Sequence, residues 1–351
     1  MKKNILFTFL IAGLISCKSN KISTSNDVNS NVTIIQKFSN TINVKDAKKH
    51  LYTLASDEYE GRRTSEKGQK MAAEYLSKQY KKFGIKGIEG TQNYFQIVPI
   101  EALINKRRKF EPTNASENVL AFIEGSEKPE EIIVISSHYD HEGIKKGEIY
   151  PGADDNASGT TGVLEIAQAF SKAKKAGYGP KRSILFMNFT GEEKGLLGSK
   201  YYVANPTYPL KNIVAALNID MIGRVNKEHE NNPNYVYVIG ADRLSTELHT
   251  INETANKSSV NLDLDYTYNK DSDPNRFYFR SDHYNFAKNG IPIIFYFNGV
   301  HEDYHKPTDT ADKINYELLV KRAQLVFSTA WELANRTDRL IVDINDDSSS
   351  N

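Results

Sequence analysis

Acidic and imidazole side chains recur at five places in the sequence, each after an apolar run or in a glycine-bounded loop. The segments are His138-Tyr139-Asp140, Pro151 to Gly159, Gly191-Glu192-Glu193, Ile219-Asp220 and Asp303-Tyr304-His305. Each alone is a weak signal, but several carboxylates brought together repel one another unless a cation or shared protons compensate. Two imidazoles with three or more carboxylates suit zinc. Two metals bridged by a carboxylate would use more of these acids than a single four-ligand structural site.

Apolar segments around these residues have the spacing of strands and helices that alternate along the chain. Strands are predicted at 95–100, 119–123, 131–137, 184–189, 213–219, 236–239 and 292–297, and helices at 71–83, 163–170, from about 194, and at 319–333. This alternation predicts an α/β fold, a three-layer sandwich with a mostly parallel central sheet flanked by helices. Ligands of such sheets bind outside the carboxyl ends of the strands. We therefore expect the acidic and imidazole segments to meet at this edge.

The composition excludes several classes of protein. The chain has 351 residues with 45 basic and 44 acidic side chains, so it lacks the basic excess of a nucleic-acid-binding protein. One cysteine cannot form an internal disulfide, so a hydrophobic core must hold the fold. Without a repeat or a second composition block, we predict a single catalytic domain at 42–340 and a disordered tail at 341–351. Within the domain, 226–279 is polar and poorly periodic, and we interpret it as an insertion that could wall a substrate cleft.

The N-terminal segment has the pattern of an export signal. Two lysines precede an apolar run from Ile5 to Ile15, which is too short to span a bilayer comfortably. Cys17 directly follows a Leu-Ile-Ser sequence, as in a bacterial lipoprotein cleavage site. We expect a lipoprotein signal peptide at 1–16, then a lipidated Cys17 and a flexible tether at 17–41. The protein would be periplasmic or at the outer membrane or cell surface, and would touch a membrane only through this lipid.

Several segments together resemble the secreted di-zinc aminopeptidases of peptidase family M28, whose relatives include glutamate carboxypeptidases, glutaminyl cyclases and transferrin receptors. The resemblance runs from Leu54–Arg62 to the closing helix. Its most specific parts are His138-Tyr139-Asp140, Gly152 to Gly159, Gly191 to Ser199, Asn218 to Gly223 and Tyr304-His305. It implies a zinc-exopeptidase-like (phosphorylase/hydrolase-like) fold.

The resemblance also implies two zinc ions per chain that share one carboxylate. The implied ligands are His138 and Asp220 for one ion, Glu193 and His305 for the other, and Asp155 for both. The family's bridging carboxylate directly precedes a segment that Asn156 to Gly159 matches, which favours Asp155 over its neighbour Asp154.

Three further residues receive roles from the resemblance. Glu192 would be the general base, because a metal-bound carboxylate such as that of Glu193 is a poor proton acceptor and a free one is needed beside the water. An exposed acid favoured at a helix start is the alternative interpretation of Glu192. Asp140 would orient the His138 imidazole and raise its basicity. Tyr304 could donate a hydrogen bond to the oxyanion, although some family members supply that tyrosine from elsewhere.

Other chemically suggestive residues are interpreted as structural. Ser281-Asp282-His283 has the composition of a catalytic triad, but neighbouring residues in one short segment rarely face each other, so we interpret it as structural or pocket-lining. His141, His301 and Glu302 are interpreted as loop residues.

The predicted function is therefore that of a di-zinc exopeptidase, an aminopeptidase acting on peptides with a free N-terminus. Carboxypeptidase or dipeptidase activity stays open, as do side-chain specificity and oligomeric state. One alternative is a single-zinc glutaminyl-peptide cyclotransferase, although those enzymes typically carry Ser where this chain has Asn156. Another is a non-catalytic binding protein, although such relatives have lost metal ligands that this chain keeps.

Overall fold

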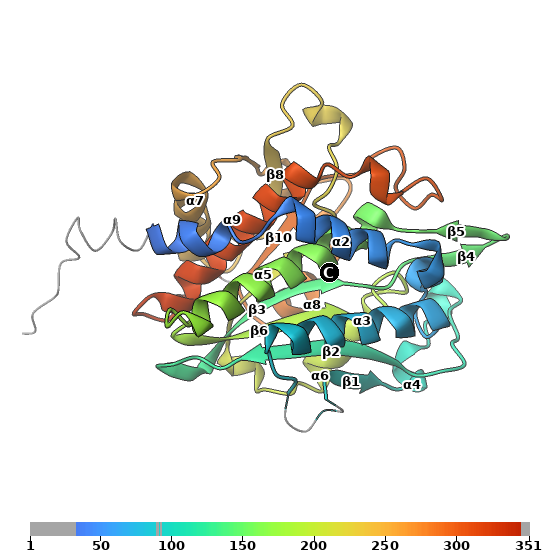
Figure 1. The fold of residues 1–351 in the computed structure, drawn as a ribbon, viewed down its shortest axis with the longest axis horizontal. Helices are drawn as coiled ribbons and strands as arrows, with labels where there is room; N and C mark the ends of the chain where they lie inside the picture. Colours follow the sequence, from blue (N-terminus) through green and yellow to red (C-terminus); the bar gives the residue numbers. More distant parts are fainter. Residues whose placement is uncertain (1–32, 89–90, 92, 345–351) are drawn as a thin grey trace, which may run out of the picture.

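A computed structural model describes residues 33–88, 91 and 93–344, and its centre is an eight-stranded sheet (Figure 1). The strand order is β1–β2–β6–β3–β7–β10–β8–β9, and the pairs β6–β3, β3–β7, β7–β10 and β8–β9 are parallel. The strands are β1 (Phe95–Val98), β2 (Ser116–Ile123), β3 (Lys128–His138), β6 (Arg182–Phe189), β7 (Ile213–Ile219), β8 (Tyr235–Ile239), β9 (Asp263–Asp265) and β10 (Ile293–Phe297). A separate hairpin consists of β4 (Gly143–Lys145) and β5 (Glu148–Tyr150).

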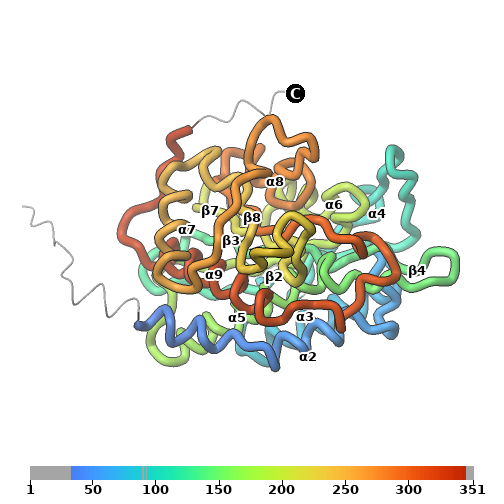
Figure 2. Tube along the Cα trace, turned by 90° about the horizontal axis from the view of Figure 1, so that it is seen from above, coloured from blue at the N-terminus to red at the C-terminus, as the bar shows by residue number. Residues whose placement is uncertain are grey.

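Helices cover both faces of this sheet (Figures 1 and 2). One layer contains α2 (Val44–Leu54), α3 (Lys67–Phe83), α5 (Gly159–Lys175), α7 (Thr246–Ser258) and α9 (Tyr316–Asn335). The other contains α6 (Leu197–Ala204) and α8 (His283–Ala287), with α4 (Ile100–Leu103) beside α6. Short turns are η1 (Asp57–Arg62), η2 (Lys106–Arg108), η3 (Ala153–Ser158), η4 (Leu210–Asn212), η5 (Lys227–His229), η6 (Thr267–Asn269), η7 (Phe277–Phe279) and η8 (Ala311–Lys313).

The apolar runs predicted as strands are buried on both sides. In β3, Ile133 and Ile135 pack against the α5 and α9 layer, while Ile132 and Val134 pack against the α6 and α8 layer. A strand covered on both faces needs apolar residues at every position, which is why the pattern is continuous rather than alternating. The predicted three-layer α/β sandwich is confirmed.

The interpretation of 226–279 as an insertion is wrong. This range contains β8, α7 and β9, so it supplies two strands of the central sheet and a helix packed on α9. Most α7 side chains are polar, six of its thirteen residues are exposed, and its buried face includes Leu248, Asn252 and Ala255. So few apolar residues give a weak helical pattern, which is why the sequence reads as irregular.

The predicted domain boundary near residue 42 is too late. Residues 33–39 are helical, Ile35 and Phe38 belong to the core, and the Phe38 ring stacks on Trp331 with centroids 6.0 Å apart. At the other end, the Asp343 carboxylate accepts the Thr246 N–H at 2.9 Å, so the described start of the predicted tail contacts α7. The predicted signal and Cys17 lie outside the described residues. No helix in the described ranges is long and apolar enough to cross a membrane.

Arg62 ties three segments of the chain together. Its guanidinium donates to the main-chain oxygens of Leu54 at 2.6 Å, Tyr139 at 2.9 Å, Pro151 at 2.7 Å and Gly152 at 2.9 Å. Burial lowers the pKa of Arg62 to about 10, so the group stays charged at neutral pH. The end of α2 and the loops after β3 and β5 thereby share one buried cation.

A second buried polar contact joins α2 to α5. Glu165 Oε2 accepts the Asn43 N–H at 3.2 Å, and Oε1 lies 3.7 Å from His50 Nε2. Burial raises the pKa of Glu165 to about 7, and burial lowers the pKa of His50 to about 4. Near pH 6 both groups are therefore neutral in the folded protein.

We predict that Glu165→Gln raises stability at alkaline pH. The folded protein keeps the Glu165 proton up to about pH 7, whereas the unfolded chain releases it near the ordinary glutamate pKa of 4.5, so stability falls as pH rises between these values. At about 1.4 kcal/mol per pKa unit, the variant would gain up to about 3 kcal/mol above pH 7 and little below pH 4.5. Urea unfolding across this pH range checks it. A variant less stable at pH 8 would indicate a charged Glu165–His50 pair instead.

We predict that Arg62→Lys destabilises the fold by at least about 3 kcal/mol, because one ammonium cannot serve four carbonyl oxygens that a guanidinium reaches together. Arg63→Lys is the matched control. Its side chain is 33% exposed and pairs with Glu66, so it should cost less than about 1 kcal/mol. Denaturant unfolding of both variants makes the comparison. Equal losses would contradict the role given to Arg62.

Candidate metal centre

The carboxyl ends of four neighbouring strands bring the predicted site residues to one edge of the sheet. β6, β3, β7 and β10 are adjacent and parallel, so their carboxyl ends meet there. His138 ends β3, Glu192 and Glu193 follow β6, Asp220 follows β7, Tyr304 and His305 follow β10, and η3 adds Asp155.

The first group of possible ligands comprises His138, Asp155 and Asp220, all buried. Nδ1 of His138 lies 3.1 Å from the main-chain oxygen of Asp140, which can only accept, so Nδ1 carries a proton. Nε2 lies 3.3 Å from Asp155 Oδ1 and 3.3 Å from Asp220 Oδ1. Two ligand atoms on a tetrahedral zinc ion lie about 3.3 Å apart, given bonds of about 2.0–2.1 Å. The spacing therefore fits a metal ion.

The second group is built around the other oxygen of the same carboxylate. His305 Nε2 lies 2.9 Å from Asp155 Oδ2 and 3.3 Å from Glu193 Oε2. Burial lowers the pKa of His305, but the hydrogen bonds with Asp155 and Glu193 outweigh burial and raise it to about 11. A proton on this imidazole thus compensates the carboxylates where a metal ion could do so. Asp155 faces one group with each oxygen.

Asp155, rather than Asp154, stands between the imidazoles. Asp154 Oδ1 accepts the Gly223 N–H at 2.7 Å, and Oδ2 lies 3.2 Å from His301 Nε2. The Asp309 carboxylate accepts the main-chain N–H groups of Asp154 and Asp155 at 3.0–3.2 Å. The Asp309 bonds hold the main chain of both aspartates, and the two side chains have different partners.

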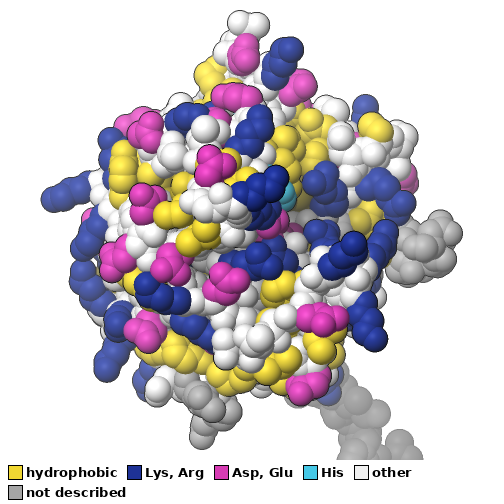
Figure 3. All heavy atoms as spheres, turned by 90° about the vertical axis from the view of Figure 1, so that its right-hand side faces the viewer, with side chains coloured by type: hydrophobic (Ala, Val, Ile, Leu, Met, Phe, Trp, Pro, Cys, Tyr) yellow, Lys and Arg dark blue, Asp and Glu magenta, His cyan; other side chains and the backbone are white. Residues whose placement is uncertain are grey.

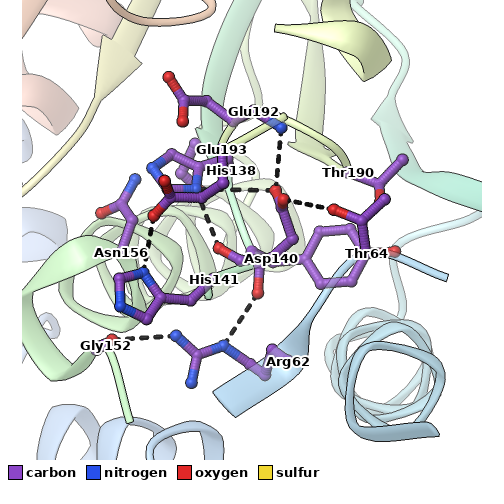
Figure 4. Close-up of polar contacts among 12 residues, drawn as sticks. Arg62, Thr64, His138, Asp140, His141, Gly152, Asn156, Thr190, Glu192 and Glu193 are labelled. Atoms are coloured by element: carbon purple, nitrogen blue, oxygen red, sulfur yellow. Dashed lines mark hydrogen bonds and ion pairs between the residues drawn. The ribbon is translucent and has the colours of Figure 1, made fainter. Parts of the chain in front are cut away.

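Asp140 contacts His138 in a different way from the one expected. The main-chain oxygen, not the carboxylate, accepts from His138 Nδ1; the nearest carboxylate oxygen is 3.8 Å away. Instead Oδ1 accepts the Glu192 N–H at 3.1 Å and Oδ2 accepts the Thr64 hydroxyl at 2.7 Å (Figure 4). The tight turn after β3 puts the main-chain carbonyl nearest the ring. The carboxylate of Asp140 therefore holds the main chain of Glu192.

Glu192 keeps its carboxylate free. Within the described residues, this carboxylate makes no hydrogen bond or ion pair, and it points away from Glu193 and His138 in Figure 4. It lines the same pocket as Asp155 and Asp220. Burial raises the pKa of Glu192 well above its usual range. The side chain is partly buried and lines the pocket, whereas the helix-start acid considered as an alternative would be exposed.

The pocket above these acids encloses about 340 Å³, part of it open to solvent. Its remaining lining residues are Met221, Phe277, Arg280, Phe295, Phe297, Val300 and Tyr304. The Tyr304 ring stacks on His305 with centroids 3.9 Å apart, and its hydroxyl lies 3.5 Å from Arg280 Nη2. Burial raises the pKa of Tyr304, so the phenol keeps its proton. One wall is thus aromatic, and the floor is acidic.

Basic side chains surround this face of the molecule. Figure 3 shows Lys and Arg gathered around the place where a histidine reaches the surface. A second hollow reaches Glu193 and is lined by Arg63, Arg108, Lys109, Lys145 and Lys194, with Phe110 and Glu142. Although the net charge of the chain is near zero, basic side chains therefore lie around a centre of acidic side chains.

His141 and His301 lie in loops, as interpreted, but both side chains are buried, which the sequence did not indicate. His141 is 0% exposed, with Nδ1 2.8 Å from Glu193 Oε1 and 3.8 Å from Asp155 Oδ2. His301 is 7% exposed and faces Asp154. Glu302 is on the surface and pairs with Arg224. The sequence feature that could have pointed to His141 is its place in the same turn as His138, which puts a second imidazole beside the site.

The Ser281-Asp282-His283 segment does not form a catalytic triad, in line with its interpretation as structural. The Ser281 hydroxyl donates to Asp220 Oδ2 at 2.7 Å, Asp282 Oδ1 accepts from Ser199, and His283 Nε2 contacts the Tyr278 main-chain oxygen at 2.8 Å. Each side chain has its own partner. Ser281 helps to fix the carboxylate of Asp220.

The donor set fits metal ions. Two groups of buried imidazole and carboxylate atoms, each within 4.8 Å of one another, share Asp155: one is His138 with Asp155 and Asp220, the other His141 with Asp155 and Glu193. His305 contacts the same Asp155 and Glu193 carboxylates. Among the described residues, Glu193 Oε1 and both ring nitrogens of His141 are buried without a hydrogen-bond partner. Buried polar atoms are seldom left unpaired, so these atoms call for another partner. Nitrogen and carboxylate ligands of this kind are those that zinc takes in proteins.

Known proteins share both sequence and fold with this chain. A probable leucine aminopeptidase of Arthroderma otae is 33% identical over 237 residues, which cover 65% of this chain and 61% of the relative. The chain thus spans about three fifths of that relative's length. The solved LapA aminopeptidase of Legionella pneumophila superposes with a TM-score of 0.66 at 19% identity, covering 96% of this chain and 81% of that one.

A solved glutaminyl cyclase of Porphyromonas gingivalis also superposes, with a TM-score of 0.62 at 18% identity over 82% of this chain and 97% of that one. The fold alone therefore does not separate a peptidase from a cyclase. The sequence match is more specific, because the profile of peptidase family M28 matches residues 118–330, which include His138, Asp155, Glu193, Asp220 and His305. The chain belongs to peptidase family M28.

Proposed function

We propose that this protein is a di-zinc aminopeptidase that removes N-terminal residues from peptides. The observation that carries the proposal is the shared carboxylate of Asp155, whose two oxygens face two separate sets of imidazole and carboxylate donors. Two donor sets joined in this way suit a pair of metal ions. Family membership and the leucine aminopeptidase relative support the choice of peptides as substrates.

In the proposal, the five ligands implied by the resemblance hold two zinc ions. His138 and Asp220 would hold one ion, Glu193 and His305 the other, and Asp155 both. Bound zinc would lower the pKa of a water molecule and polarise the scissile carbonyl. Ser281 keeps the Asp220 carboxylate in place, and the Asp309 bonds to the main chain keep Asp155 in place.

Glu192 is the proposed general base. Its carboxylate is free of hydrogen bonds within the described residues and lies in the same pocket as two of the proposed ligands, Asp155 and Asp220. It would accept a proton from the attacking water and deliver it to the leaving amine. The bond from its N–H to Asp140 holds the main chain from which this carboxylate extends. Asp140 thus acts as a positioning residue.

Tyr304 and the aromatic wall would act on the substrate. The protonated phenol of Tyr304 could donate a hydrogen bond to the oxygen that becomes negative during attack. Phe277, Phe295 and Phe297 could accommodate an apolar side chain of the first residue of the peptide. Both roles require the substrate's N-terminus to lie over the acidic floor.

The cellular placement is proposed from the sequence alone. A signal at 1–16 and a lipid on Cys17 would put the enzyme in the periplasm or at the outer membrane or cell surface, where it would trim extracytoplasmic peptides.

The proposal predicts about two zinc ions per chain and hydrolysis that requires a free α-amine and stops with a chelator. His305→Ala should lower the zinc content toward one, because it removes a donor from one set. His229→Ala, which removes an imidazole outside both sets, should keep two. Elemental analysis and a panel of aminoacyl anilides and N-acetylated peptides provide the readout. One zinc with cyclisation of N-terminal glutamine would identify a cyclase, and a folded, metal-free, inactive protein would indicate a binding function.

We expect Glu192→Gln to lower turnover by at least about 10²-fold while the zinc content stays the same, because only the proton acceptor is lost. Glu302→Gln is the matched control, since it neutralises an exposed carboxylate on a neighbouring loop. Steady-state kinetics and zinc analysis on the same samples check both points. Near-full activity in the Glu192 variant would rule out this residue as the base.

A further inference from the structure

His141 is a buried imidazole that the function proposed above does not use. It lies in the turn after β3, is 0% exposed, and has a ligand atom within 4.8 Å of ligand atoms of Asp155 and Glu193. Nδ1 lies 2.8 Å from Glu193 Oε1 and 3.8 Å from Asp155 Oδ2 (Figure 4 shows the contact with Glu193). It therefore reaches the same two carboxylates as His305.

The contact between His141 and Glu193 is at ion-pair distance, but its angles are poor for a hydrogen bond. His141 Nδ1 and Glu193 Oε1 both count among the buried atoms without a hydrogen-bond partner in the described residues. Two such atoms at 2.8 Å, poorly aligned with each other, are poorly stabilised unless something lies between or beside them. A metal ion that accepts a lone pair from each would satisfy both atoms.

The distances around the second donor set agree with a four-donor arrangement. Donors on tetrahedral zinc lie about 3.3 Å apart. The separations from His305 Nε2 to Asp155 and Glu193 are 2.9 and 3.3 Å, and those from His141 Nδ1 to Glu193 and Asp155 are 2.8 and 3.8 Å. These values bracket the expected one. The two imidazoles thus approach the same pair of carboxylates, with their ring centroids 5.6 Å apart.

The position of the His141 ring is fixed by its surroundings. The main-chain N–H of His141 donates to the main-chain oxygen of Arg62 at 3.2 Å, and this bond fixes the backbone that carries the ring. Gly152 has φ 55° and packs so closely that a Cβ there would lie 2.4 Å from His141 Cγ. The ring meets His305 edge-on, with centroids 5.6 Å apart. A preorganised ring of this kind is what a metal ligand requires.

We propose that His141 is a protein ligand of the second metal ion, together with Asp155, Glu193 and His305. This inference rests on the proposed di-zinc site and adds to it one donor that the resemblance does not supply. The second ion would then have four protein donors against three for the ion at His138, Asp155 and Asp220. We expect the second ion to be released last.

The competing explanation is that His141 only adjusts the position of Glu193 without touching metal. Cadmium-113 NMR separates the two explanations, because a coordinated imidazole nitrogen couples directly to the bound cadmium. The sample is the full chain with ¹⁵N-labelled histidine, reconstituted with ¹¹³Cd²⁺ in place of zinc. The proposal requires three coupled imidazoles, with His141 coupled through Nδ1.

The affinity test uses His141→Ala and the matched control His50→Ala, which removes a buried imidazole of α2 outside the donor sets. Zinc competition with a chromophoric chelator should show one ion bound at least about tenfold more weakly in His141→Ala and unchanged in the control. Circular dichroism checks that both variants fold. If a variant does not fold, the number of cadmium-coupled imidazoles in the wild-type protein still tests the proposal.

The outcomes distinguish the two proposals. Two bound ions with only two coupled imidazoles would overturn the role of His141 and leave the proposed function standing. The same holds for a folded His141→Ala that keeps both ions at wild-type affinity. A wild-type protein that binds fewer than two ions would overturn the di-zinc function itself, and with it this inference.

Discussion

The carboxylate of Asp155 lies among three imidazoles, 3.3 Å from His138, 2.9 Å from His305 and 3.8 Å from His141. Glu193 and Asp220 crowd the same space, and so many buried acids are tolerated only with compensating positive charge. The surrounding fold serves to keep the η3 loop in this place. Asn156 donates to the Ile219 main-chain oxygen at 3.0 Å and accepts from Met221 at 3.1 Å, which attaches the loop to the end of β7.

The part of the fold that positions the site could be predicted from the sequence, because its strands are buried on both faces. β3, β6, β7 and β10 read as uninterrupted apolar runs, and the acidic or imidazole residues after them had to meet at one edge. The periphery could not be predicted in this way. Residues 33–39 and α7 bury only a few apolar side chains each, so their patterns resemble those of a tether and a loop.

Within the candidate site, the sequence predicted which residues lie close together, but it did not predict which of their atoms are in contact. The resemblance named Asp155 over Asp154, and in the structure Asp155 lies near His138 and His305 while Asp154 faces His301. Asp140 was expected to hold His138 through its carboxylate, yet the turn places its main-chain oxygen there. His141 was overlooked for the same reason. Whether a side chain points inward from a turn depends on dihedral angles that residue types alone do not determine.

The helical segment at 33–39 joins the body at the end of the sheet opposite the site, since Phe38 packs on Trp331 and on Tyr178, which follows the far end of α5 (Figure 1). Only residues 18–32 separate it from Cys17, a length that reaches at most about 50 Å when fully extended. With a lipid on Cys17, the molecule would therefore be attached to the membrane through the end of the sheet opposite the site. The attachment point would then lie at the side opposite the pocket mouth, so the tether itself would leave the mouth free for peptides.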